Sequence, residues 1–314
     1  MTTALGSGTL TFEVVEGWAK LPQGWSLKEC PDVAVDSKDR VYVFTRGEHG
    51  VIVFDRDGNF LSSWGEGVFG SAHGICIGPD DSVYCVDNGD HTVRKFSTDG
   101  ELLMTLGTKD QPAPRFSGEA FNLPTGLAVS HKTGDLFISD GYGNARVHKY
   151  STEGRHIMSW GSSGIDEGQF VIPHNIAVDR DDNVYVADRE CHRVQVFDPN
   201  GRLQAIWSNI WKPSGIRVGV DGNVYIAELL ADSYYADAPD VGHRVSIYSQ
   251  SGKLLGRLGD SQWGEGPGQF VSPHGIALDS RGDIYVGEVS WTMMGRILEP
   301  PRELRSLQKL ARTA

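Results

Sequence analysis

Three histidines recur at nearly equal intervals along the chain. His73, His174 and His274 lie 101 and 100 positions apart, and each is the second residue of a similar segment, Ala-His-Gly-Ile, Pro-His-Asn-Ile or Pro-His-Gly-Ile. Three neutral imidazoles suit Zn²⁺ and other first-row divalent ions, and three protein ligands leave a position open for water or substrate, as in catalytic metal sites. A lone histidine here would be explained by packing or a hydrogen bond. Three in one register favour a metal site.

Three further side chains depart from the pattern of the segments that contain them, namely Arg46, Tyr142 and Arg189. A guanidinium group binds a carboxylate through two hydrogen bonds, and a tyrosine hydroxyl beside a dication loses its proton more readily than in water. We therefore predict a general base at Tyr142 and an anion clamp at the two arginines. The alternatives are a surface ion pair for each arginine and a purely structural role for Tyr142.

A repeated element must position these six residues. A segment of the form Pro-x-Gly-apolar-Ala-Val-Asp, then a Gly/Asp turn, then Val-Tyr-Val-Ala-Asp occurs six times, and from Asp32 to His274 its period is about 48 residues. Two further alternating runs follow in most repeats, so each repeat predicts four short strands, the signature of a propeller blade. The expected fold is all-β, a six-bladed β-propeller, with residues 1–314 forming a single domain.

The repeats place the histidines in alternate blades. The position after the proline, or after Ala72 in the second repeat, is occupied in turn by Asp32, His73, Thr125, His174, Ser214 and His274. The first strand of a blade lines the central channel and alternate blades stand about 120° apart, so we expect the three imidazoles to point at one spot. The loop after the second strand returns to the same rim, and these loops carry Arg46, Tyr142 and Arg189.

The two ends of the chain complete each other in this scheme. The last repeat lacks a fourth strand, while residues 9–15 form an isolated strand pattern, so we expect the N-terminal strand to close the last blade. Residues 302–314 are expected to form a short basic helix. The fifth repeat carries a long insertion, residues 229–243, which could form a lid over the site and select a small substrate.

Composition limits the partners. The net charge is −12 and the pI is about 5.3, which argues against a nucleic-acid partner. No run of about 18 apolar residues could span a bilayer, and the N-terminal residues lack the pattern of a secretory signal, so we expect a cytoplasmic protein with no membrane partner. The oligomeric state is left open.

The sequence pattern of the repeats resembles NHL repeats over nearly the whole chain. A closer resemblance, to peptidyl-α-hydroxyglycine α-amidating lyase, a six-bladed zinc propeller, rests on Arg46-Gly-Glu-His49, Pro173-His174, Ser139-Asp-Gly-Tyr-Gly-Asn-Ala-Arg146, Ala187-Asp-Arg-Glu190 and Pro273-His274. The resemblance implies cleavage of the C–N bond of an N-acyl-α-hydroxyglycine into an amide and glyoxylate. It implies that His73, His174 and His274 hold zinc, that Tyr142 is the base, and that Arg46 and Arg189 orient the substrate.

The sequence also departs from that family at three positions. Gly143 stands where the family has a cysteine after the catalytic tyrosine, Ser272 stands where it has a methionine, and Gly275 stands where it has an aspartate. These departures make a structural calcium ion doubtful. The expected substrate is a small molecule or a short peptide-like compound with a carboxylate.

Two other functions remain open on the sequence alone. The same metal could generate hydroxide and hydrolyse a lactone, ester or amide. The chain could also be a non-catalytic NHL binding propeller, with the histidines incidental or the metal structural.

Overall fold

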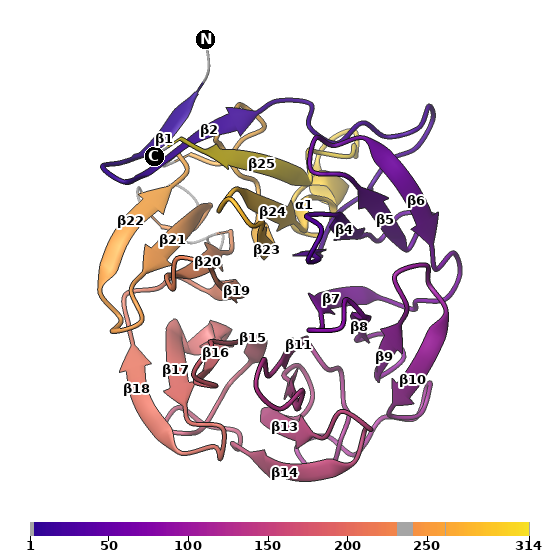
Figure 1. Cartoon of the computed structure of the whole chain (residues 1–314), viewed down its shortest axis with the longest axis vertical. Helices are drawn as coiled ribbons and strands as arrows, with labels where there is room; N and C mark the ends of the chain where they lie inside the picture. The colour runs from indigo at the N-terminus through magenta and orange to yellow at the C-terminus, as the bar shows by residue number, and fades with distance from the viewer. Residues whose placement is uncertain (1–2, 231–240, 261, 314) are drawn as a thin grey trace. The chain divides into compact units, whose positions relative to one another are not determined.

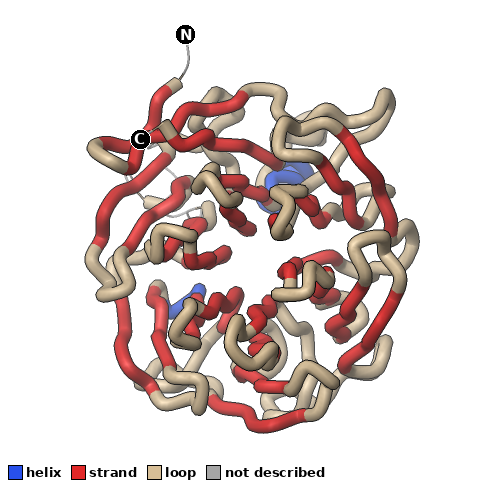
Figure 2. Tube along the Cα trace, viewed as in Figure 1, coloured by secondary structure: helices blue, strands red, loops and turns tan. Residues whose placement is uncertain are grey.

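The computed structural model describes residues 3–230, 241–260 and 262–313. They fall into two compact units, a middle unit, Gly67–Ile216, and a terminal unit made of Met1–Glu66 and Arg217–Ala314. Helix is confined to short segments, and nearly everything else is strand, turn or loop (Figure 2). The greater part of the predicted 229–243 lid, residues 231–240, lies outside the described residues, and the prediction of a single domain stays a prediction.

The middle unit contains three antiparallel sheets, each of four strands in chain order, which we call the second, third and fourth blades (Figure 1). Their strands are β7 (Ala72–Ile77), β8 (Val83–Asp87), β9 (Thr92–Phe96) and β10 (Leu102–Leu106); β11 (Gly126–Val129), β12 (Leu136–Asp140), β13 (Arg146–Tyr150) and β14 (His156–Trp160); β15 (Pro173–Val178), β16 (Val184–Asp188), β17 (Arg193–Phe197) and β18 (Leu203–Trp207). A 3₁₀ turn, η1 (Arg189–Cys191), follows β16.

The terminal unit contains the first, fifth and sixth blades. Its strands are β3 (Asp32–Val35), β4 (Val41–Phe44), β5 (Val51–Phe54) and β6 (Phe60–Trp64); β19 (Pro213–Val218, whose first residues belong to the middle unit), β20 (Val224–Glu228), β21 (Arg244–Tyr248) and β22 (Leu254–Leu258); β23 (Pro273–Leu278), β24 (Ile284–Glu288), β25 (Leu307–Arg312), β2 (Leu10–Val15) and β1 (Ala4–Ser7). Two short helices, α1 (Ser290–Met293) and η3 (Gly295–Ile297), follow β24. These six sheets are the blades of the predicted β-propeller.

In the first, fourth and sixth blades, the Asp and Tyr of the repeated motif fix the turn between the first two strands. In the fourth blade Asp179 Oδ1 accepts hydrogen bonds from the backbone N–H groups of Asp181 and Asn183, both at 2.9 Å, and the Tyr185 hydroxyl donates to Asp179 Oδ2 at 2.9 Å. Asp279 and Tyr285 make the same hydroxyl contact at 3.0 Å in the sixth blade. The aspartate thus satisfies turn donors that would otherwise be left without partners, and it ties the turn to a buried ring.

The glycine after the histidine allows neighbouring first strands to approach closely. A Cβ atom on Gly74 of β7 would lie 2.9 Å from the carbonyl oxygen of Thr125, just before β11. In the terminal unit, a Cβ atom on Gly275 of β23 would lie 2.3 Å from Cα of Asp32 in β3. Both separations are shorter than real Cβ contacts, so only glycine fits at these two positions, and His73 and His274 are each carried on a strand that packs tightly against the next blade.

The sixth blade joins both ends of the chain. Its strand order is β1, β2, β25, β24, β23, and β2 pairs antiparallel with β25 from Phe12 opposite Arg312 to Val15 opposite Lys309. The predicted closure of the last blade by the N-terminal strand is confirmed. The predicted helix over residues 302–314 is wrong, because Leu307–Arg312 is a strand. β2 and β24 each present an open edge, and pairing the segment with both outweighs its helical propensity.

No helix within the described part of the chain is both long and apolar enough to cross a membrane.

Candidate metal and catalytic site

Two of the predicted metal ligands lie side by side in the middle unit. His73 is the second residue of β7 and His174 is the second residue of β15, and they are 1% and 0% exposed. Their ring centroids are 4.9 Å apart, and their ligand nitrogens lie within 4.8 Å of each other. The shared register has therefore placed two imidazoles at one point, as predicted for these two residues.

Backbone carbonyl groups fix which ring nitrogen of each imidazole carries the proton. Nδ1 of His73 lies 2.6 Å from the carbonyl oxygen of Thr125, and Nδ1 of His174 lies 2.8 Å from that of Ser214. A carbonyl oxygen only accepts hydrogen bonds, so Nδ1 must be the N–H in both rings. Each neutral imidazole then presents the lone pair of Nε2, which is the orientation of metal-binding histidines with a hydrogen-bonded outer nitrogen.

Tyr142 brings its hydroxyl to the same two nitrogens. Its oxygen lies 3.1 Å from Nε2 of His73 and 2.9 Å from Nε2 of His174, and Nη1 of Arg189 donates to it at 3.1 Å. The hydroxyl has one hydrogen, so it can donate to only one imidazole, and the other contact joins two lone pairs. A cation is what relieves such a contact. The donor set therefore fits a divalent metal ion bound through imidazole nitrogens.

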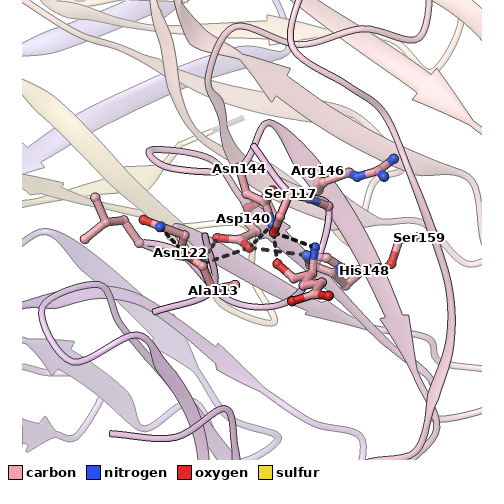
Figure 3. Close-up of polar contacts among 12 residues, drawn as sticks. Ala113, Ser117, Asn122, Asp140, Asn144, Arg146, His148 and Ser159 are labelled. Carbon is pink, nitrogen blue, oxygen red and sulfur yellow. Dashed lines mark hydrogen bonds and ion pairs between the residues drawn. The ribbon is translucent and has the colours of Figure 1, made fainter. Parts of the chain in front are cut away.

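A buried carboxylate holds the loop that carries Tyr142 (Figure 3). Asp140, at the end of β12, accepts hydrogen bonds from the backbone N–H of Asn122 at 3.0 and 3.1 Å and from the side-chain amide of Asn144 at 2.9 Å. Nε2 of the buried His148 lies 3.3 Å from Asp140 Oδ2. The loop is thus tied at both ends, which fixes the backbone from which the Tyr142 side chain projects.

The residues on either side of Tyr142 leave no room for side chains. A Cβ atom on Gly141 would lie 2.4 Å from the carbonyl oxygen of Pro173, and one on Gly143 would lie 2.0 Å from Asn122 Oδ1. The glycine that stands at 143 in place of the family's cysteine is therefore required by the local packing of this chain. Tyr142 is half-buried between them, and its backbone N–H donates to the carbonyl oxygen of Leu123 at 3.3 Å.

Arg189 holds the tyrosine from the neighbouring blade. It begins the 3₁₀ turn after β16, its backbone N–H donates to the carbonyl oxygen of Ile172, and Nε donates to Glu190 Oε1 at 2.8 Å. Its guanidinium carbon lies 5.3 Å from the centre of the Tyr142 ring. Burial acts to lower the pKa of Arg189, but the neighbouring Tyr142 and Glu190 outweigh it and raise the pKa. Arg189 is therefore charged at any working pH.

The third predicted ligand occupies the same place in its own blade of the terminal unit. His274 is the second residue of β23 and is 4% exposed. Its Nδ1 lies 2.6 Å from the carbonyl oxygen of Pro31, so this imidazole also presents Nε2. All three histidines thus share one register, one tautomer and one kind of outer hydrogen bond.

Arg46 is held by a carboxylate that the sequence analysis missed. Its Nη1 donates to Oε1 of Glu29 at 2.8 Å, and its backbone N–H donates to the carbonyl oxygen of Glu29. Glu29 is 1% exposed and also accepts hydrogen bonds from the backbone N–H and the hydroxyl of Thr292 in α1, both at 2.7 Å. Glu29 lies in the segment before the first repeat, where no register marks it, so repeat analysis had no signal for it.

The acidic residue that ends most second strands has a structural role. Asp188 accepts hydrogen bonds from the backbone N–H groups of Val171 and Ile172 and pairs with Arg193 at 2.9 Å. Glu288 accepts the equivalent backbone bonds through Oε2, while its buried Oε1 has no hydrogen-bond partner among the described residues. Burial raises the pKa of Glu288 to about 7.

Comparison with known proteins shows similarity to NHL-repeat proteins and to an amidating lyase. The NHL repeat model matches residues 121–150 and 170–197. The chain is similar to human NHL repeat-containing protein 3, with 34% identity over 300 residues that cover 89% of this chain and 82% of the human protein. It is also similar to peptidyl-alpha-hydroxyglycine alpha-amidating lyase 1 of Drosophila melanogaster, with 33% identity over 258 residues that cover 74% of this chain and 45% of that protein.

Longer relatives match with a similar share of this chain. Peptidyl-glycine alpha-amidating monooxygenase B of Xenopus laevis is 28% identical over 322 residues, covering 88% of this chain. The chain spans about a third of the length of the Xenopus and rat amidating monooxygenases that it matches. Among solved structures, that of streptogramin B lyase superposes with a TM-score of 0.62 at 13% identity, covering 96% of this chain and 98% of the other, which supports the fold alone.

Proposed function

The chain belongs to the family of NHL-repeat-containing proteins, and from that premise we propose that it is a metal-dependent lyase acting on an α-hydroxy-amide. The proposed reaction cleaves the C–N bond of an N-acyl-α-hydroxyglycine-like substrate into an amide and a carbonyl product such as glyoxylate. The observation that carries the proposal is the hydroxyl of Tyr142, which contacts Nε2 of His73, Nε2 of His174 and the guanidinium of Arg189 at 2.9 to 3.1 Å. Relatives named as amidating lyases support the reaction class.

We propose that His73, His174 and His274 hold the metal, Zn²⁺ or another first-row divalent ion. The support is their common register, their buried rings and the carbonyl groups that orient Nε2 of each as a ligand. When bound, such an ion acts as a Lewis acid on an oxygen of the substrate and makes its hydroxyl easier to deprotonate. The neutral ligand set leaves the full positive charge of the ion available for this role.

The proposed chemical roles of the chain's own residues follow from the contacts of Tyr142. In its deprotonated form the oxygen of Tyr142 accepts the proton of the substrate hydroxyl, the electrons of the O–H bond form the new carbonyl, and the C–N bond breaks with its electrons on the amide nitrogen. The proton then passes from Tyr142 to that nitrogen, which leaves as a primary amide. Arg189 stabilises the oxygen of Tyr142 while the tyrosine carries negative charge, since a guanidinium can only donate hydrogen bonds.

The two arginines define the substrate class. A guanidinium group binds a carboxylate bidentately, and a glyoxylate-forming substrate carries a carboxylate on the reacting carbon. Glu29 and Glu190 hold Arg46 and Arg189 in place, at 2.8 Å each. We therefore propose that the substrate is a small molecule or a short peptide-like compound with a free carboxylate next to its hydroxyl-bearing carbon.

The direct test is glyoxylate release from N-acetyl-α-hydroxyglycine by purified protein loaded with Zn²⁺. We expect amide and glyoxylate in equal amounts, loss of turnover after chelation, recovery when metal is restored, and much slower turnover of the methyl ester than of the free acid. A metal-loaded, folded protein that releases no glyoxylate above the uncatalysed rate would refute the lyase proposal. Hydrolysis of a lactone or ester by that same preparation would instead identify a hydrolase.

A further inference from the structure

An ion pair with little exposure to solvent joins the first and fifth blades of the terminal unit. Nη2 of Arg217, on β19, lies 3.1 Å from Oδ2 of Asp32, the first residue of β3. The side chain of Asp32 is 1% exposed and that of Arg217 is 17% exposed. Solvent screens such a pair only weakly, so the two charges hold each other in place.

Arg217 departs from the repeat that contains it. It is the fifth residue of β19. The fifth residue of the first strand is Cys76 in the second blade, Ala177 in the fourth and Ala277 in the sixth. A long cationic side chain thus stands where those blades have a small one, and the repeat itself does not account for it.

The pair adjoins the group that orients His274. Nδ1 of His274 donates to the carbonyl oxygen of Pro31 at 2.6 Å, and Asp32 directly follows Pro31. Oδ1 of Asp32 accepts a hydrogen bond from the backbone N–H of Val33 at 2.9 Å, while Oδ2 faces Arg217. The carboxylate is therefore tied to its own strand and to the fifth blade, which fixes the backbone that carries the Pro31 carbonyl group.

The Asp32 side chain also takes the space of an aspartate that the related lyases have. The resemblance to that family implies an aspartate at position 275 and a structural calcium ion, but this chain has Gly275. A Cβ atom on Gly275 would overlap Oδ1 of Asp32 and lie 2.6 Å from the carbonyl oxygen of Pro31. An aspartate at 275 has no room here, so the residues of this chain do not fit a calcium ion held in that way.

The donor set around Asp32 is also too poor in carboxylates for calcium. Calcium takes about six to eight oxygen ligands, and carboxylates usually supply several of them. Among the described residues, Asp32 belongs to no group of three or more His, Cys, Asp or Glu side chains that could share a metal ion. A guanidinium group can pair with a single carboxylate. The chain thus has both a carboxylate and a cation at this place, and both come from its own sequence.

We propose that the ion pair of Arg217 and Asp32 takes the place of a structural calcium ion in this chain, and that Arg217 is a positioning residue for His274. The inference rests on the proposed function only in taking His274 as a ligand of the catalytic metal. It predicts that the stability of the protein does not depend on calcium. It also predicts that loss of the guanidinium group weakens zinc binding, because the Pro31 carbonyl group that orients His274 is then held less firmly.

The first experiment adds calcium to the zinc-loaded protein. Millimolar CaCl₂ should change Tm no more than MgCl₂ does at the same concentration. A rise in Tm of several degrees with CaCl₂ alone would overturn the proposal and leave the lyase proposal standing. The measurement needs no turnover, so a protein that is indifferent to calcium and releases no glyoxylate would refute the lyase and support the ion pair.

The second experiment removes the guanidinium group. Arg217→Met leaves Asp32 without this cation, and we expect Tm to fall by about 6 to 10 °C and zinc affinity, measured by competition with a chromogenic chelator, to fall by about tenfold or more. Arg40→Met is the matched control, because Arg40 pairs with Asp36, which is buried just beyond the other end of β3. The control should lower Tm and keep the wild-type zinc affinity.

Two more variants keep the test decisive if Arg217→Met folds poorly. Arg217→Lys retains a positive charge and should bind zinc more tightly than Arg217→Met. Asp32→Asn combined with Arg217→Met removes both charges and keeps an oxygen for the N–H of Val33, so it should recover most of the lost Tm. Wild-type zinc affinity in folded Arg217→Met, or equal losses of zinc affinity in Arg217→Met and Arg40→Met, would overturn the positioning role.

Discussion

Replacing Tyr142 with phenylalanine removes one oxygen atom and keeps the ring. That oxygen contacts Nε2 of His73 at 3.1 Å, Nε2 of His174 at 2.9 Å and Nη1 of Arg189 at 3.1 Å. If Tyr142 is the general base, the variant has no acceptor for the substrate's hydroxyl proton. Loss of a positioned base lowers kcat by about 10² to 10⁴, which corresponds to about 3 to 5 kcal/mol of activation free energy.

The same change should cost the fold little. The hydroxyl can donate to only one of two imidazoles, so its removal also removes a contact between two lone pairs, and Arg189 keeps its bond to Glu190. We expect the free energy of unfolding to change by about 1 kcal/mol or less. For a chain of 314 residues this corresponds to a shift in Tm of about 2 °C.

The assay is single-turnover glyoxylate release together with metal content and thermal unfolding of the same preparation. Tyr150→Phe is the matched control, because it removes the hydroxyl of another half-buried tyrosine, on β13 of the same blade. We expect that control to keep wild-type kcat. A Tyr142→Phe protein with full metal content and wild-type kcat would show that the tyrosine is only part of the wall. A protein that loses its metal would show that the hydroxyl acts chiefly in binding the ion.

Two further predictions concern the metal and the buried acid. His174→Ala should reduce bound metal from about one ion per chain to a small fraction, measured by elemental analysis, and undiminished metal with normal activity would contradict the site. Burial raises the pKa of Glu288 from 4.5 to about 7, so the folded state binds a proton there that the unfolded state has lost. This stability is fully present below about pH 4.5, declines as pH rises, and is lost above about pH 7, an effect of about 3 kcal/mol. Denaturant titrations of Glu288→Gln should lack that decline, and an unchanged pH dependence would show that another group causes it.

The fold and the positions of the three histidines were predictable for the same reason, which is repetition. His73, His174 and His274 could be recognised because each occupies a position that the other repeats fill with Asp32, Thr125 and Ser214. The segment that forms β25 was wrongly predicted to be a helix. Its pairing partner in the sixth blade, β2, lies far away in the sequence. Local sequence does not record a strand that forms only by filling a gap between two distant edges.

The parts of the site that escaped prediction are backbone groups and residues outside the register. The carbonyl oxygens of Thr125, Ser214 and Pro31 orient the three imidazoles, yet every residue has such an oxygen, so no side chain marks them. Glu29 holds Arg46, but it lies before the first repeat and has no equivalent to compare with. In a repeat, a functional side chain is recognised because it differs from the residues at equivalent positions. Backbone carbonyl groups and residues outside the repeats cannot be compared in this way.

The pairing of β2 with β25 also affects when the sixth blade can form during synthesis. Residues 10–15 are synthesised long before their partner, Leu307–Arg312. Until then, β2 and β24 are without the strand that joins them in the finished blade, and open strand edges invite pairing with other chains. Of the six blades, the sixth is therefore the last to be completed during synthesis, and a chain that stops before residue 307 leaves the edges of β2 and β24 open.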